Sequence, residues 1–285
     1  MATPQNPSGA RRRGFWVLAV VLAGVAVVIG VFWALQRSLI YFPDTSSVPP
    51  ANEALSGGQD VYLQTSDGLA LEAWFAPPNP QVEDRQLAVL VAPGNAANRY
   101  NRVGLAEALQ AQGFSVVLMD YRGYSTNPGR PSQEGLIRDG RAALEAHEQQ
   151  GFPPERTIYF GESLGGGVVA ALLTERPPAG VVFRSPFTEL ADVGRHHYPW
   201  LPVRTMLRDQ FPVLEPVRET QVPVSVIRAR YDSVVPTELS AQVADAAPNL
   251  VAEHIVDADH NDPQMHGAAV AQAVAELADV ISLHD

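Results

Sequence analysis

Short apolar segments alternate with helix-like segments along most of the chain, from about residue 59 to the C-terminus. The apolar segments have the length of strands that are buried on both faces of a parallel sheet. The first two flank a Ser66-Asp67-Gly68 turn, which predicts a hairpin. The alternation therefore predicts an α/β fold in which helices cover both faces of a mostly parallel, eight-stranded sheet.

The pattern places these elements along the chain. The expected strands cover residues 61–64, 69–75, 87–92, 115–120, 157–160, 180–183, 222–228 and 251–256. The expected helices cover residues 101–112, 134–149, 164–173, 237–247 and 263–283. In such a sheet the ligand site lies beyond the carboxyl ends of the strands, so the residues that follow each strand are the candidates for chemistry.

One segment near the N-terminus departs from this alternation. Residues 14–35 are 22 consecutive positions without a charged side chain, with Trp16 and Trp33 near the two ends. As a helix this segment spans about 33 Å, enough to cross a hydrocarbon layer of about 30 Å. A cleaved signal peptide is the competing interpretation, but its apolar region is normally shorter and bulky residues occupy the expected cleavage positions. A buried core helix fits less well, because no face of the segment is polar.

We therefore expect an uncleaved transmembrane anchor. Three arginines precede it at residues 11–13 and one follows at Arg37, which predicts a cytoplasmic N-terminus and an extracytoplasmic body. The resulting organisation is a cytoplasmic tail (1–13), an anchor (14–35), a Pro/Ser-rich tether (36–58) and a catalytic domain (59–285).

Composition narrows the function classes. The chain has 285 residues and no cysteine, which excludes disulfides and thiolate metal sites. All 20 basic residues are arginine, and residues 38–285 hold 16 of them against 31 acidic residues. This acidic body argues against a nucleic-acid partner.

The candidate chemistry centres on the sequence Gly161-Glu162-Ser163-Leu164-Gly165, between an expected strand and an expected helix. Gly-x-Ser-x-Gly in this context is typical of a nucleophile elbow, a sharp turn that exposes the serine hydroxyl. The glycines are needed because side chains at either position would collide with neighbouring backbone. The alternative is a chance occurrence of the pattern in a glycine-bearing loop.

Two further residues lie just beyond strand ends in the order that a hydrolase triad requires. Asp232 follows strand 222–228 and His260 follows strand 251–256, so the chain order is serine, acid, histidine. His260 would take the proton of Ser163, and Asp232 would orient the imidazole ring. Each residue also has a purely structural alternative. His260 could be a solvated loop histidine, and Asp232 could cap the helix that follows it. The carboxylates at positions 257, 259 and 262 are too close to His260 in sequence to be confident orienters.

An oxyanion hole needs two converging N–H donors. One is expected from the backbone of Leu164, directly after the nucleophile. The other is expected from Asn95, in the Pro93-Gly94-Asn95 loop that follows strand 87–92. A plain glycine turn is the alternative for this loop.

From about Leu39 onward the chain resembles the α/β-hydrolase superfamily. More narrowly, it resembles membrane-anchored single-pass serine hydrolases whose vertebrate members include depalmitoylases and lysophospholipase-type lipases. The segments that carry this resemblance are LIYFP (39–43), GNA (94–96), DYRGY (120–124), GESLG (161–165), SPFT (185–188), DSVVP (232–236) and HND (260–262). The resemblance implies the α/β-hydrolase fold and carries the family's triad over to Ser163, Asp232 and His260.

The chain departs from the family pattern at three places without losing a triad member. Pro93 replaces a histidine, Ser125 replaces a common glycine, and Arg228-Ala229 replaces His-Gly before the acid. Within DYRGY we expect Arg122 to brace the sheet by an ion pair with Asp120, with binding of a substrate anion as the alternative.

The sequence thus favours a membrane-anchored serine hydrolase of carboxylic esters or thioesters, with small-molecule or lipid acyl substrates. A peptidase of the same fold and a non-catalytic binding module are the alternatives. Residues 186–222 are expected to form a short lid whose aromatic residues either line an acyl pocket or cover the elbow helix. No metal-ligand spacing and no dinucleotide fingerprint is present, so we expect neither a metal nor another cofactor.

Overall fold

The computed structural model describes the backbone of residues 7–282 and the side chains of residues 12–282. This part of the chain divides into two compact units, one ending at Ile40 and the other beginning at Tyr41. Residues 1–6 of the expected tail and residues 283–285 of the expected catalytic domain lie outside the described residues.

The first unit is the helix α1 (Pro7–Ile40), which contains the whole segment expected to be an anchor. Most of its apolar side chains from residue 12 onward are exposed: Trp16 and Trp33 have 66% and 50% of their surface accessible. By length and composition the helix from Arg12 to Ile40 can cross a membrane, and a signal sequence would have the same properties.

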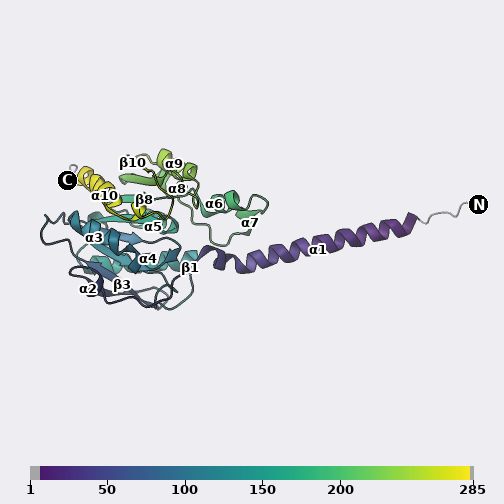
Figure 1. Ribbon diagram of the computed structural model, residues 1–285, viewed down its shortest axis with the longest axis horizontal. Helices are drawn as coiled ribbons and strands as arrows, with labels where there is room; N and C mark the ends of the chain where they lie inside the picture. The colour runs from purple at the N-terminus through teal and green to yellow at the C-terminus, as the bar shows by residue number, and fades with distance from the viewer. Residues whose placement is uncertain (1–6, 283–285) are drawn as a thin grey trace, which may run out of the picture. The chain divides into compact units, whose positions relative to one another are not determined.

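The second unit, drawn in Figure 1, contains an eight-stranded sheet. Its strand order is β10-β9-β8-β7-β4-β6-β3-β2. Its strands are β2 (Gln59–Gln64), β3 (Ala70–Ala76), β4 (Ala88–Ala92), β6 (Ser115–Met119), β7 (Thr157–Glu162), β8 (Gly180–Arg184), β9 (Val224–Ala229) and β10 (Leu250–Val256). Strands β10 to β6 run parallel, and the β2–β3 hairpin is antiparallel at one edge. This confirms the predicted mostly parallel eight-stranded sheet.

Helices cover both faces of the sheet, as expected from the alternation. Helices α3 (Val103–Ala111) and α10 (Ala268–Ser282) contact each other, while α4 (Gln133–Gln149), α5 (Leu164–Glu175), α8 (Leu214–Glu219) and α9 (Thr237–Ala246) form a second contiguous series. The remaining short helices are α2 (Ala51–Ala54), η1 (Arg99–Arg102), η2 (Pro154–Arg156), α6 (Leu190–His197), α7 (Val203–Met206) and η3 (Pro263–His266).

The four central strands are buried along their whole length, which explains their uninterrupted apolar sequences. Edge strand β10 instead alternates between exposed and partly buried positions. The register aligns Ala92 with Gly161 on β4 and β7, and Glu162 with Arg184 on β7 and β8. The carboxyl ends of three neighbouring strands therefore meet at one edge.

The segment that follows α1 is integrated into the second unit. Strand β1 (Phe42–Pro43) pairs in parallel with β5 (Ala96–Ala97), in the loop after β4. Tyr41 donates a hydrogen bond through its hydroxyl to Asp209, at 3.0 Å. The region expected to be an extended tether therefore contains ordered elements, β1 and α2, that pack on the fold.

Candidate active site

Ser163 lies on a sharp turn between β7 and α5. Its backbone has φ 50° and ψ −114°, in the left-handed region that a residue with a side chain enters only under strain. The two flanking glycines make the turn sterically feasible. A Cβ at position 165 would lie 2.1 Å from the carbonyl oxygen of Ala92, and one at position 161 would lie 2.8 Å from the Cα of Gly166. The geometry is that of a nucleophile elbow.

His260 and Asp232 come from the loops after β10 and β9 and contact each other directly. The His260 Nδ1 is 2.8 Å from Asp232 Oδ2 and 3.0 Å from Oδ1, and both side chains are almost fully buried. Burial raises the pKa of Asp232, but the hydrogen bond and charge of His260 and the N–H of Val235 outweigh it and hold the pKa below its usual value. Asp232 is therefore an ionised acceptor beneath the imidazole ring.

The other candidate acids have different partners. Asp259 accepts hydrogen bonds from the backbone N–H of His260 at 2.6 Å and from Ser233. Asp257 pairs with Arg230, and Asp262 accepts from the backbone N–H of Asp259. These contacts shape the histidine loop and leave Asp232 as the carboxylate at the ring nitrogen.

The two residues expected to supply oxyanion donors lie directly after the nucleophile and in the loop between β4 and β5. Leu164 is the first residue of α5, where backbone N–H groups have no acceptor within the helix. Asn95 lies in a loop whose carbonyl oxygens are fixed: Tyr121 donates to that of Pro93 at 3.0 Å and Tyr124 donates to that of Asn95 at 2.7 Å. The carbonyl of Asn95 also accepts from the N–H of Phe42, at 2.8 Å.

The DYRGY segment therefore supports the loop through its two tyrosines, a role that the sequence analysis missed. The prediction of an ion pair between Arg122 and Asp120 is wrong. Arg122 pairs with Asp139 on α4 and with Asp67 in the β2–β3 turn, at 2.8 and 2.7 Å. Asp120 is occupied by Arg99, whose backbone N–H and guanidinium both donate to it.

The lid segment divides its aromatic residues between two environments. Phe211 is fully buried over α5, where a Cβ on Gly167 would lie 2.6 Å from the Phe211 Cβ. Tyr198 and Trp200 are exposed. Phe211 therefore covers the elbow helix α5. In the same segment, His197 Nε2 contacts the Val234 carbonyl oxygen at 2.8 Å, which links residues 186–222 to the loop that carries Asp232.

Three further charged residues converge behind the elbow, and the sequence analysis did not single them out. Glu162 contacts Arg102 and Arg184, and all three side chains are buried. The position of Glu162 inside the Gly-x-Ser-x-Gly motif was the one available signal. Within residues 12–282, no group of three or more histidine or acidic residues could hold a metal ion.

Known proteins resemble this chain over most of its length. The Hydrolase_4 family, described as serine aminopeptidase S33, matches residues 84–282. The uncharacterised protein Rv2307c of Mycobacterium tuberculosis is 45% identical over 257 residues, covering 90% of this chain and 91% of that protein. The lysophosphatidylserine lipase ABHD12 of Danio rerio is 27% identical, covering 83% of this chain and 72% of that protein.

The fold also resembles those of solved structures. The esterase Pf2001 of Pyrococcus furiosus superposes with a TM-score of 0.65 over 85% of this chain and 97% of the esterase, at 20% sequence identity. This confirms the α/β-hydrolase fold that the sequence predicted. With its strand order, its elbow between β7 and α5 and a family match across the catalytic unit, this chain belongs to the Hydrolase_4 (serine aminopeptidase S33) family of α/β hydrolases.

Proposed function

We propose that the protein is a membrane-anchored serine hydrolase that cleaves carboxylic esters or thioesters through an acyl-enzyme on Ser163. The observation that carries this proposal is the pairing of His260 Nδ1 with Asp232 at 2.8 Å. This contact fixes the ring tautomer and leaves Nε2 as the nitrogen that can accept a proton. The strained turn at Ser163 supports the same assignment.

In the proposed reaction His260 Nε2 removes the proton of the Ser163 hydroxyl as its oxygen attacks the acyl carbon. The negative charge that develops on the carbonyl oxygen is stabilised by the backbone N–H groups of Leu164 and Asn95. His260 then protonates the leaving alcohol or thiol. A water molecule, activated by the same nitrogen, hydrolyses the acyl-enzyme and restores the serine. Asp232 stays ionised throughout and stabilises the imidazolium.

Acyl substrates, including lipids, fit this assignment better than peptides recognised by their free N-terminus. An aminopeptidase needs a free carboxylate near the nucleophile for the substrate's terminal ammonium group. Glu162, the carboxylate adjacent to Ser163, is already engaged by Arg102 and Arg184. The relatives point the same way, since one is named a lysophosphatidylserine lipase and a fold neighbour is named an esterase.

The proposal is tested by labelling the full chain in detergent with a fluorophosphonate probe, comparing wild type with Ser163→Ala. Hydrolysis of p-nitrophenyl esters of graded chain length and of amino-acid p-nitroanilides is measured in parallel. Labelling and ester turnover that are both lost in Ser163→Ala support the proposal. Faster anilide than ester turnover would favour the peptidase. A folded wild type that neither labels nor turns over any substrate would leave the binding module.

We also propose that α1 is an uncleaved anchor over residues 14–35, with residues 1–13 in the cytoplasm and the catalytic unit outside. The flanking arginines support this orientation. Membrane fractions washed with alkaline carbonate should retain the protein with its N-terminus intact. A protein found in the soluble fraction that begins after residue 35 would establish a signal peptide instead.

A further inference from the structure

Burying a charged side chain costs free energy unless it is paired in a fixed geometry. A buried cluster of three charged groups that contacts the loops of an active site is therefore a candidate for a functional role. Glu162, Arg102 and Arg184 form such a cluster, with side chains 5%, 6% and 1% exposed. Two arginines on one carboxylate leave a net positive charge inside the protein. Each member comes from a different element: Glu162 ends β7, Arg102 ends η1 and Arg184 ends β8.

Glu162 is the hub because it is the last residue of β7 and directly precedes Ser163. Its side chain also fixes the approach of the oxyanion loop: a Cβ at Gly94 would lie 3.0 Å from Glu162 Oε1. Burial raises the pKa of Glu162, but the charges of Arg102 and Arg184 outweigh it and hold the pKa well below its usual range. The carboxylate is therefore ionised at neutral pH.

Arg102 links this hub to the loop that follows β4. Its Nε and Nη2 contact the two oxygens of Glu162 at 3.2 and 2.7 Å, a bidentate arrangement. Its Nη1 donates to the carbonyl oxygens of Ala96 and Asn98, both at 3.1 Å. One planar guanidinium therefore holds the segment directly after Asn95 against the residue that precedes the nucleophile.

Arg184 links the same hub to the histidine loop. It ends β8 in register with Glu162, so the two side chains lie side by side, with Nη2 of Arg184 3.0 Å from Glu162 Oε1. Its Nη1 donates to the backbone carbonyl of His260 at 2.8 Å, and its own carbonyl accepts from the N–H of Ser163 at 2.8 Å. The nucleophile and the base are thus both tied to one residue.

We propose that Arg102 and Arg184 are positioning residues for hydrolysis, and that Glu162 holds them so that the oxyanion loop, the nucleophile and His260 keep their mutual placement. This inference rests on the proposed function of Ser163, Asp232 and His260. A displacement of about 1 Å among reacting groups can lower the rate about 100-fold. We therefore expect changes in the cluster to reduce kcat without weakening substrate binding.

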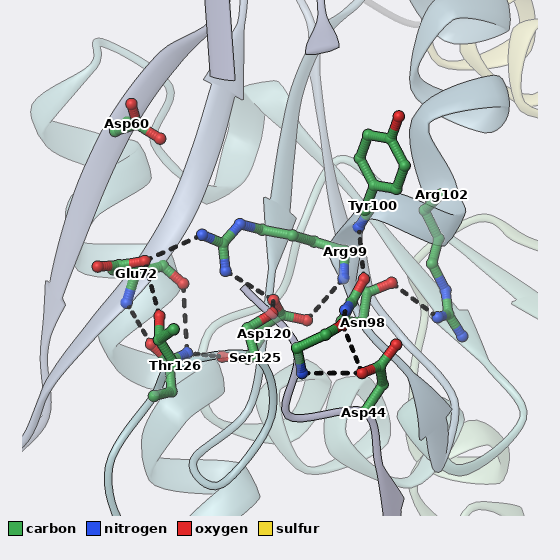
Figure 2. A network of polar contacts seen from close by, with 12 residues as sticks. Asp44, Asp60, Glu72, Asn98, Arg99, Tyr100, Arg102, Asp120, Ser125 and Thr126 are labelled. Atoms are coloured by element: carbon green, nitrogen blue, oxygen red, sulfur yellow. Dashed lines mark hydrogen bonds and ion pairs between the residues drawn. The ribbon is translucent and has the colours of Figure 1, made fainter. Parts of the chain in front are cut away.

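The turn that carries Arg102 also supplies a matched control. Arg99 lies on the same short helix, is equally buried and also forms an ion pair, but its guanidinium points the other way, toward Asp120 and Glu72 (Figure 2). Arg99→Lys therefore perturbs a buried ion pair of the same kind without touching the elbow or the histidine loop. Lysine keeps the charge at each position but replaces the planar fork of donors by a compact ammonium group, which cannot reproduce the bidentate contact.

The experiment compares Arg102→Lys, Arg184→Lys, Glu162→Gln and Arg99→Lys in the full chain in detergent, by thermal unfolding and by kcat and KM for a p-nitrophenyl ester. We expect the first three to lose about 10- to 100-fold in kcat with KM within about twofold. Arg99→Lys should lose a similar amount of Tm and keep kcat within about twofold. If a lysine variant does not fold, Glu162→Gln, which preserves shape, decides the question.

The split between kcat and KM separates positioning from a structural role. A loss of packing lowers Tm in all four variants, whereas only displacement of the reacting groups lowers kcat at unchanged KM. Folded Arg102→Lys and Arg184→Lys variants with wild-type kcat, or an equal loss of kcat in Arg99→Lys, would overturn the inference. A wild type without turnover would instead refute the proposed function.

Discussion

His147 is a buried histidine on α4 that the proposed reaction does not use, and it makes the stability of this protein depend on pH. Its side chain is 1% exposed, and both ring nitrogens are buried without a hydrogen-bond partner among the described residues. The ring packs edge-on against Phe152, with centroids 5.5 Å apart. Burial lowers the pKa of His147 from 6.5 to about 4, because nothing compensates the charge of the protonated ring.

The direction of the effect follows from the two pKa values. The unfolded chain binds a proton at His147 below about pH 6.5, whereas the folded protein binds it only near pH 4. The stability that comes from keeping His147 neutral is therefore fully present above pH 6.5, and it is lost as the pH drops toward 4. One pKa unit corresponds to about 1.4 kcal/mol, so the loss at pH 4 is about 3 kcal/mol of the free energy of unfolding.

The assay is urea unfolding of wild type and His147→Phe between pH 7 and pH 4. Trp74 reports unfolding of the catalytic unit, because it is fully buried while Trp16, Trp33 and Trp200 are exposed. Phenylalanine keeps the aromatic packing and cannot be protonated, so the difference between the two proteins isolates His147 from other titrating groups. The stability of His147→Phe relative to wild type should rise by about 3 kcal/mol across this range.

A His147→Phe variant that loses stability in parallel with wild type from pH 7 to pH 4 would refute the reasoning, since it would mean that His147 finds a compensating partner or solvent when protonated.

Three further outcomes are expected from the site. Asp232→Asn should lower kcat about 10⁴-fold with little change in Tm, because the amide favours the wrong histidine tautomer; a loss under 10-fold would remove Asp232 from the triad. Tyr124→Phe removes the hydrogen bond to the Asn95 carbonyl and should lower kcat about 3- to 10-fold at unchanged KM, measured against wild type with one ester. Gly165→Ala should lower the free energy of unfolding by about 3 kcal/mol or more, because its Cβ would lie 2.1 Å from the Ala92 carbonyl oxygen. A variant as stable as wild type would contradict the rigidity of the elbow.

Much of the fold could be predicted because the relevant signals are local. Continuous apolar strands, intervening helical segments and the Ser66-Asp67-Gly68 turn each depend on neighbouring residues, and the observed strands differ from the expected ones by only a few positions. The candidate triad could be named for the same reason, because topology brings the residues after parallel strands to one edge. Its catalytic role stays a prediction until the nucleophile is labelled.

What could not be predicted depends on pairing between distant segments. Arg102 and Glu162 are 60 positions apart, and Arg184 reaches a carbonyl 76 positions away. The pairing of Arg122 with Asp139 rather than with Asp120 likewise depends on how distant segments pack together. Each arginine had several acids within reach of a plausible fold, and only the packed arrangement determines which carboxylate faces which guanidinium.

The pairing of β1 with β5 has a consequence for the fate of the protein after proteolysis. Phe42 hydrogen-bonds to the Asn95 carbonyl and lies two residues after the end of α1. A cut before Tyr41 would release a body that still holds its oxyanion loop, whereas a cut anywhere from Asp44 to Pro50 would release one that has lost this strand. With α1 as the proposed anchor, the position of such a cut would therefore decide whether the released unit keeps the strand that pairs with the Asn95 loop.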